Sequence, residues 1–518
     1  MPSTLSYPGI YIEEVASPVR TVVGVPTAVA AFVGRARLGP VDRPVRIKGF
    51  GDFERNFGGL WSFSELGHAV QQYFQNGGAD AYVVRVAPAD ASTLTFTPPG
   101  GGNLPLTATN PGAWANGLKI SVDHDTRDVS GPGTPAVDEF NLKVELSLKD
   151  PVSGQNDITT EVFRNVSVLA TSPTFVKTVL DNSSNLIAVS GVVPGARPAE
   201  GDYEAVGNAS DGSALTASDL APTTGPQGKK GMFLLEDAEI FTILVIPSYS
   251  PNEGVAPLDV PASVWSAGLQ YCRQKRAMLI VNPPTTWVTK DKVKPTDIDQ
   301  LRDKNSVTYF PDVYFADPLI KGQPRLFSPA GAMAGVMART DQERGVWKAP
   351  AGEEAKINAA MGLQYTLTDP ENGDLNPLAI NCLRTFPIVG SVCWGARTLA
   401  GADAQASEWK YLPVRRTALF LEETLYRSTR WIIFEPNDEP LWSQIRLNIG
   451  AFLQSLYRQG AFQGATPKQA YFVKCDAETT TQDDINKGIV NILVGFAPLK
   501  PVEFVVIKFS QLAGQIPV

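Results

Sequence analysis

Histidine is nearly missing from this chain of 518 residues, which contains only His68 and His124. His68 falls within a predicted helix, and His124 stands between two aspartates in a polar turn. A Ser-His-Asp triad requires a histidine that reaches the nucleophile, and a zinc site requires more ligands than this turn supplies. We therefore expect no catalytic triad, no metal site, no cofactor and no enzyme activity.

Cysteine is also scarce, and long apolar runs are missing. Cys272, Cys382, Cys393 and Cys475 lie far apart without a CxxC spacing, which predicts buried, reduced thiols in a cytosolic product. No apolar run is long enough to span a bilayer. Residues 1–4 carry neither the basic nor the apolar stretch of a Sec-type signal. These absences predict a cytosolic protein that does not insert into a membrane.

The remaining chemical motifs are weak. Residues 225–231 resemble a phosphate-binding loop, but the spacing is wrong and neither Ser nor Thr follows the lysine, so we predict a linker. Nothing in the sequence indicates that Asp312, Asp317 and Asp341 converge, and we interpret them as solvated loop residues. The net charge of −8 is small for this length, which argues against nucleic acid as a direct partner.

What the sequence does contain is the composition of a folded protein with several domains. Hydrophobic residues make up 43% and charged residues 19%, and the length exceeds what one core supports. Residues 27–86 read as a β-α-β unit, and residues 88–230 read as an inserted all-β module, best explained by a sandwich. Residues 233–315 alternate strands and helices over a parallel sheet, ending with a helix at 296–305 and a strand at 307–315. The pattern beyond residue 362 is α+β, so the predicted fold class combines α/β and α+β domains.

One long amphipathic helix is predicted over residues 439–460. Its apolar residues recur at the spacing that places them on one face of a helix. These residues are Trp442, Ile445, Ile449, Phe452, Leu453 and Leu456.

Both ends of the chain read as β-strands with no neighbouring strand to pair with. Residues 7–15 alternate apolar and polar side chains, and residues 503–509 are rich in β-branched and aromatic types. An open strand edge invites another chain, so the ends are either arms that complete a neighbour's sheet or edge strands of their own domain. The side chains concerned are Tyr7, Ile10, Tyr11, Ile12 and Val15 in the first segment and Phe504, Val505, Val506, Ile507 and Phe509 in the second.

A series of short strings, in the same order along nearly the whole chain, resembles the tail sheath proteins of contractile phage tails and of phage-tail-like contractile injection systems. Each string is modest alone, but their number and order are specific. The strings are residues 7–14, 57–59, 74–78, 111–116, 344–350, 394–398, 473–476 and 497–504.

The resemblance implies a structural protein. Sheath proteins of this family form six-subunit rings that stack helically around an inner tube, with terminal arms that join neighbours by strand exchange. From a metastable extended state they contract and drive the tube through a target envelope. The implied partners are further copies, the inner tube protein, and baseplate and tail-terminator or cap proteins. The particle is a phage virion tail or a contractile injection device, assembled in the bacterial cytoplasm.

The resemblance also implies a division of the chain into segments. These are an arm (1–22), the first part of the core (23–88), an outward-facing β module (89–230), an α/β middle domain with a subtilisin-like sheet but no triad (231–361), a tube-facing α+β domain (362–500) and a second arm (501–518). The inner core is thus built from N-terminal and C-terminal parts.

Cations near the amphipathic helix are candidates to meet acidic groups on the tube. They are Arg446, Arg458 and Lys468, and the alternative is that these side chains are simply solvated. Two other functions compete with the sheath reading. The α/β pattern favours an inactive or atypical subtilisin-like hydrolase, and the inserted β module favours a carbohydrate-binding surface protein.

Overall fold

The computed structural model describes residues 21–99, 104–128, 137–250 and 257–508. The chain divides into two units, each described here by itself. The large unit comprises Thr27–Glu343 and Pro350–Leu412, and the C-terminal unit comprises Met1–Pro26, Arg344–Ala349 and Pro413–Val518. No helix in the described ranges is both long and apolar enough to cross a membrane.

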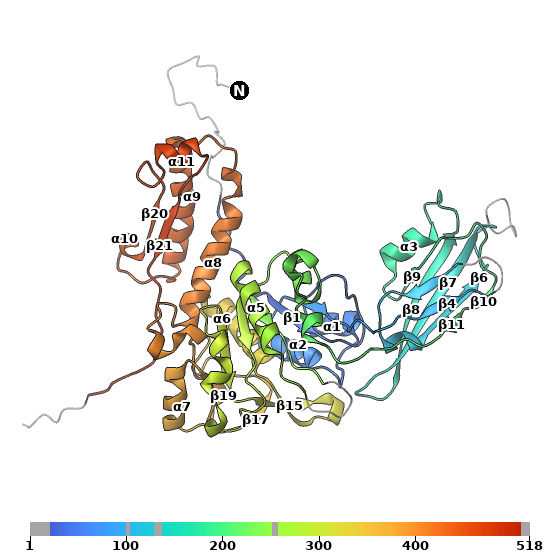
Figure 1. The fold of residues 1–518 in the computed structure, drawn as a ribbon, viewed down its shortest axis with the longest axis horizontal. Coiled ribbons are helices and arrows are strands. Elements are labelled where there is room, and N and C mark those ends of the chain that lie inside the picture. Colours follow the sequence, from blue (N-terminus) through green and yellow to red (C-terminus); the bar gives the residue numbers. More distant parts are fainter. Residues whose placement is uncertain (1–20, 100–103, 129–136, 251–256, 509–518) are drawn as a thin grey trace, which may run out of the picture. The chain divides into compact units, whose positions relative to one another are not determined.

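An eight-stranded sheet forms the centre of the large unit, in the order β19-β18-β14-β13-β12-β1-β3-β2 (Figure 1). The six strands from β18 to β3 are mutually parallel, and β2 and β19 are antiparallel edges. The strands are β1 (Ala30–Gly34), β2 (Val45–Ile47), β3 (Ala81–Arg85), β12 (Ile243–Val245), β13 (Met278–Val281), β14 (Ser306–Phe310), β18 (Asn381–Phe386) and β19 (Gly390–Cys393). This confirms the predicted parallel sheet and the mixed α/β class.

Helices cover both faces of this sheet. Phe32 of β1 packs edge-on against Tyr73 of α2, with ring centroids 5.5 Å apart. On the other face, Leu244 and Leu279 share a core with Leu269 of α5. The helices of this unit are α1 (Phe50–Phe57), α2 (Leu66–Gln75), α4 (Ala217–Leu220), α5 (Ala262–Lys275), α6 (Ala330–Arg344) and α7 (Asp369–Leu375).

Two predictions for residues 296–315 are wrong. The helix predicted at 296–305 is a 3₁₀ segment, Pro295–Leu301, because its apolar residues are too few to form a longer buried stripe. The strand predicted at 307–315 is split at Pro311 into β14 and β15 (Val313–Asp317), since proline cannot donate to a central ladder. β15 belongs to a separate three-stranded sheet with β16 (Gln323–Phe327) and β17 (Ala360–Leu363).

The inserted segment is a sandwich of two four-stranded antiparallel sheets, as predicted (Figure 1). Phe96 and Leu106 from one sheet and Ile120 and Leu142 from the other share a single core. The orders are β10-β6-β7-β8 and β11-β4-β5-β9. The elements are β4 (Thr95–Thr97), β5 (Leu106–Ala108), β6 (Leu118–Asp123), β7 (Glu139–Lys149), β8 (Asn156–Ser167), α3 (Val176–Ser183), β9 (Ile187–Val189), β10 (Gly201–Asp202) and β11 (Glu204–Val206).

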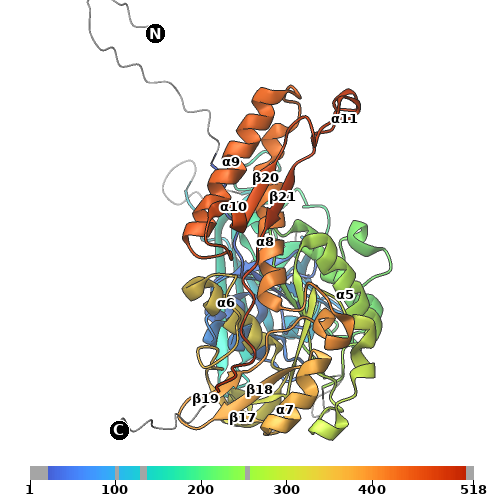
Figure 2. The ribbon, with the colours of Figure 1, turned by 90° about the vertical axis from the view of Figure 1, so that its left-hand side faces the viewer.

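The C-terminal unit packs two long helices beside a two-stranded antiparallel sheet (Figure 2). Its elements are α8 (Leu412–Ser428), α9 (Glu439–Arg458), α10 (Pro467–Ala470), β20 (Tyr471–Lys474), α11 (Gln482–Asn486) and β21 (Leu493–Phe496). The helix predicted at 439–460 is therefore present.

Strand pairing joins segments that the sequence-based division separates. β1 pairs with β12, so segments 23–88 and 231–361 contribute to one sheet, and β18 adds residues from 362–500. The sequence-based division missed this pairing because strands so far apart in sequence leave no local pattern. The boundary at residue 88 was visible because the composition changes there.

Candidate assembly surfaces

Backbone hydrogen bonds link two segments near the place where open α/β sheets bind ligands. Such ligands bind beyond the carboxyl ends of the strands, where the strand order reverses, which here lies beyond β1 and β12. The Glu65 amide donates to the Ser248 carbonyl at 3.1 Å, and the Ser250 amide donates to the Phe63 carbonyl at 3.0 Å. This closure joins the segment around residues 61–65 to residues 248–250, which follow β12 in the chain.

A buried ionic network lies next to this closure. Nε2 of His68 is 3.1 Å from Oδ1 of Asp317, and Arg325 donates to Oδ2 of Asp317 at 3.0 Å. Burial favours the protonated form of Asp317, but hydrogen bonds from His68, the Leu319 amide and Arg325 outweigh it and lower its pKa to about 2. Burial also raises the pKa of Glu65, 3.7 Å from Arg325, to about 7. The network binds α2 to β15 and β16.

The interpretation of Asp312 and Asp317 as solvated residues is wrong. Asp317 is fully buried. Burial raises the pKa of Asp312 well above its usual value, helped by the carboxylates of Glu65 and Asp259, and Oδ1 of Asp312 has no hydrogen-bond partner among the described residues. Contacts across 249 sequence positions, such as that between His68 and Asp317, leave no signal in a single sequence. Among the described residues, no group of three or more His, Cys, Asp or Glu is placed to hold a metal ion.

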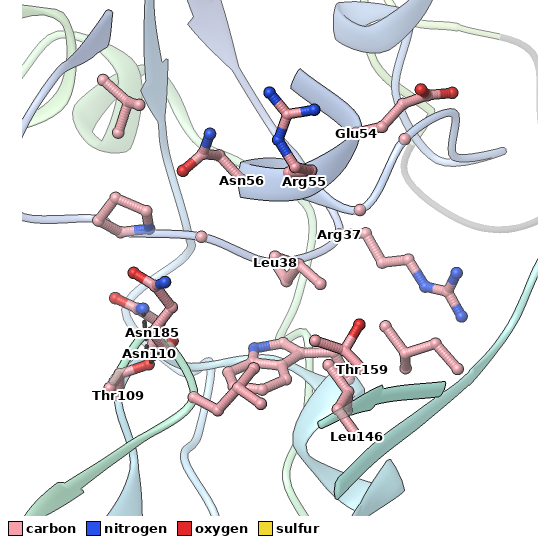
Figure 3. Close-up of a pocket in the computed structure, with 18 of the residues that line it drawn as sticks. Arg37, Leu38, Glu54, Arg55, Asn56, Thr109, Asn110, Leu146, Thr159 and Asn185 are labelled. Atoms are coloured by element: carbon pink, nitrogen blue, oxygen red, sulfur yellow. Dashed lines mark hydrogen bonds between the residues drawn. The ribbon is translucent and has the colours of Figure 1, made fainter. Parts of the chain in front are cut away.

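A groove of about 1140 Å³ separates α1 from the β-sandwich (Figure 3). Figure 3 shows Arg37 and Arg55 on the core side and Thr109, Asn110 and Asn185 on the sandwich side. The Thr109 hydroxyl donates to the Asn185 carbonyl at 2.7 Å. Burial lowers the pKa of Arg37. The described residues that line the groove include both acidic and basic side chains but neither histidine nor cysteine. The groove can therefore form hydrogen bonds with a polar solute, but it holds no nucleophile–base pair that uses histidine or cysteine.

The two-stranded sheet of the C-terminal unit has two open edges. β20 and β21 pair from Tyr471 with Phe496 to Lys474 with Leu493. Within the described chain, no further strand pairs with the other edge of either strand. Edges of this kind carry backbone donors and acceptors that another strand can satisfy. A two-stranded sheet alone is marginal, and additional strands stabilise it.

Helix α9 packs on one face of this sheet. Its buried stripe contains every residue predicted for it. Partly buried Val473 and Val494 of the sheet pack on the same core. The Asp438 side chain caps the helix by accepting from the Leu441 amide at 3.2 Å, and Trp442 Nε1 donates to Asn437 at 2.9 Å. The site is thus a rigid helix beneath an incomplete sheet.

The chain after β21 exposes a cluster of apolar side chains, four of them consecutive. Val502, Phe504, Val505, Val506 and Ile507 are 70–80% exposed and belong to no helix or strand. Such a run normally marks an interaction segment. Residues 504–507 form no strand pairing among the described residues, and pairing of the strand predicted at 503–509 with another chain stays a prediction.

Comparisons with known proteins identify this region. Residues 404–511 match the family model described as the phage tail sheath C-terminal domain. Residues 404–511, called the sheath domain below, are thus similar to the C-terminal domain of phage tail sheath proteins. The matched region contains α9, the two-stranded sheet and the exposed apolar segment. The match confirms the resemblance to contractile tail sheath proteins.

Relatives extend the likeness beyond the sheath domain. The tail sheath protein of Vibrio phage KVP40 is 24% identical over 246 residues, 47% of this chain and 32% of that protein. The tail sheath protein of Enterobacteria phage T4 is 25% identical over 185 residues, 36% of this chain and 27% of that protein. The chain thus spans about a third or less of the length of these curated relatives.

Solved structures share the fold of the sheath domain and of the rest of the chain. The sheath of an extracellular contractile injection system, PVC, in the contracted state has a TM-score of 0.58 at 22% identity, with 99% of both chains covered. The helical sheath of the anti-feeding prophage in the contracted state has a TM-score of 0.55 at 24% identity, covering 98% of this chain and all of that one. A sheath tail protein from Listeria innocua has a TM-score of 0.59 at 14% identity, covering 92% and 96%. At these identities the likeness establishes the fold.

The role of the three cations predicted to face the tube stays a prediction. Arg446 is held by Glu439 and by the Cys475 carbonyl, and this contact across 29 residues leaves no local pattern in a sequence. Arg458 and Lys468 are exposed, and their role stays a prediction. The arm residues Tyr7, Ile10, Tyr11, Ile12, Val15 and Phe509 lie outside the described residues.

Proposed function

We propose that this protein is the structural subunit of a contractile tail sheath, without enzyme activity. Six subunits form a ring, and rings stack helically around an inner tube. Contraction from a metastable extended state drives the tube through a target envelope. The partners are further copies, the tube protein, baseplate proteins and a terminator or cap, in a phage tail or injection particle assembled in the bacterial cytoplasm. The sheath domain at 404–511 supports this proposal.

The observation that carries the proposal is the combination of a strand donor and a strand acceptor in one unit. The exposed run at 504–507 has no partner in its own described chain, while β20 and β21 each offer an open edge. An arm that adds to such an edge forms about four to six backbone hydrogen bonds, each contributing roughly 0.5–1.5 kcal/mol. This gives several kcal/mol per arm, enough to keep neighbours joined while the rings rearrange.

The proposal also covers the type of parallel sheet in the large unit. We assign the parallel sheet to a subtilisin-like sheet without a triad. The order β18-β14-β13-β12-β1-β3 supports a doubly wound α/β sheet, and a fold of this kind does not by itself imply catalysis.

Electron microscopy of the purified full-length protein tests the proposal. The expected result is long tubular polymers, alone or on tubes. Deletion of residues 504–518, or of residues 1–20, is expected to abolish polymers while the thermal unfolding of the monomer is retained. Deletion of the turn at residues 152–154 of the sandwich is the matched control and leaves polymers intact. A dispersed monomer that binds glycans, or one that hydrolyses peptides, would contradict the proposal.

A further inference from the structure

Two tight turns of this protein hold large apolar residues in a conformation that normally requires glycine. Ile388 and Phe434 have φ angles of 74° and 71°. Side chains with a Cβ rarely adopt positive φ, and a β-branched residue there is an outlier. Left-handed conformations of this kind cost on the order of 1–3 kcal/mol each and persist where they serve a purpose.

The turn around Ile388 joins β18 to β19. The Val389 amide donates to the Pro387 carbonyl at 2.9 Å, which closes a three-residue turn with Ile388 at its centre. A γ-turn with positive φ at its central residue is the rare and strained form. The turn is therefore well defined, and the Ile388 side chain stands at its tip.

The turn around Phe434 lies in the loop between α8 and α9. The Glu435 amide donates to the Ile432 carbonyl at 3.1 Å, and Ile433 has φ −64° and ψ 126°. These values with the positive φ of Phe434 describe a type II turn, whose third position strongly favours glycine. Asn437 anchors the loop by donating to the Ile489 carbonyl at 2.9 Å.

The same two residues are also the most exposed large apolar side chains of the described chain. Ile388 is 106% exposed and Phe434 is 102% exposed, relative to a reference residue. Of the non-glycine residues with positive φ in the described ranges, they alone carry large apolar side chains. Ile388 and Phe434 thus each combine a strained backbone with a fully exposed apolar side chain. Neither property stabilises the isolated chain, so we expect a free-energy gain when another surface covers these side chains.

We propose that Ile388 and Phe434 are contact anchors that insert into pockets on other copies of this chain in the assembled sheath. This inference rests on the proposed function. A preformed turn that presents one large apolar side chain is a typical hot spot, because little entropy is lost on binding. One anchor lies in each unit, so a subunit can engage different copies through different surfaces, as a helical lattice built from heterologous contacts requires. Proteins of similar fold are described as forming a helical sheath, which favours a second copy as the occupant.

The test compares Ile388→Gly and Phe434→Gly with the matched control Ala406→Gly, whose residue also has a positive φ (45°) and is exposed. All three variants relieve backbone strain, so the unassembled proteins are expected to melt at the wild-type temperature or above it. Only the two anchor variants are expected to raise the critical concentration for polymer formation, by about tenfold or more, which corresponds to 1.4 kcal/mol of lost contact. Wild-type critical concentrations in both anchor variants would overturn the inference.

A second readout identifies the occupant. Photo-crosslinking from p-benzoylphenylalanine, introduced as Phe434→p-benzoylphenylalanine in assembled sheaths, is expected to give covalent dimers of this chain. Crosslinks exclusively to the tube protein would overturn the inference. If the wild-type protein forms no polymer at all, the proposed function fails instead, so the two failures are distinguishable.

Discussion

His68 and Asp317 form a buried pair in which Nε2 and Oδ1 are 3.1 Å apart and the side chains are 2% and 0% exposed. Arg325 binds the second carboxylate oxygen of Asp317. This arrangement joins α2 to the small sheet of β15, β16 and β17. It is therefore a structural connection within the large unit.

Replacing Asp317 is expected to destabilise the large unit strongly. Asp317→Asn removes the buried carboxylate that contacts His68 and the partly buried Arg325, and breaking a buried ion pair typically costs about 3–5 kcal/mol. Urea denaturation measures the loss in the free energy of unfolding. The exposed pair of Lys177 and Asp181 provides the control, since Asp181→Asn removes a surface ion pair that contributes little. Equal effects of the two substitutions would contradict this account of the network.

Glu65 gives a pH-dependent prediction with a definite sign. Its pKa is about 7 in the folded protein against an ordinary value of 4.5. The fold therefore disfavours the carboxylate, and stability is fully present below pH 4.5 and is lost as the pH rises through 7. Glu65→Gln is expected to match the wild type near pH 4.5 and to exceed it at pH 8.5 by on the order of 3 kcal/mol. Melting curves across this range measure the difference, with the exposed Glu54→Gln as control. A constant difference at all pH values would refute the prediction.

Glycine-to-alanine substitutions in two helices are expected to have opposite signs. A Cβ at Gly331 of α6 would lie 2.5 Å from the Ala69 carbonyl oxygen, whereas a Cβ at Gly450 of α9 meets nothing within 4 Å. Gly331→Ala should destabilise the protein by about 1–3 kcal/mol through overpacking. Gly450→Ala should stabilise it by about 0.5–1 kcal/mol through helix propensity. Chemical denaturation measures both, and the same sign for both would count against this description of helix packing.

The exposed cations near α9 test the proposed tube contact. Arg458→Glu combined with Lys468→Glu is expected to weaken co-sedimentation of sheaths with tubes at low salt, while sheath polymers still form. Arg446→Glu is expected to destabilise the C-terminal unit itself, because Arg446 is held by Glu439 and the Cys475 carbonyl. Thermal unfolding separates the two effects. Unchanged tube binding by the double variant would remove Arg458 and Lys468 from the interface.

Local patterns predicted the elements of this fold, whereas long-range pairing stayed hidden. The 3.6-residue periodicity of α9 and the apolar runs of β12 and β13 were sufficient to predict those elements, because burial of one face or of both faces dictates the residue types. The pairing of Ala30 with Ile243 and the burial of Asp317 depend on segments more than 200 residues apart. Pro311 was a visible signal that the strand at 307–315 ends early. The open edges of β20 and β21 also required the structure, since their propensities do not distinguish a paired edge from an unpaired one.

A helical reconstruction of the assembled sheath by cryo-electron microscopy tests the central proposal most directly. The account predicts that the sheet of β20 and β21 gains strands at its outer edges and that these strands are terminal segments, including residues 504–507, of other copies. A sheet that remains two-stranded in the polymer, or one completed by the termini of its own chain, would contradict it.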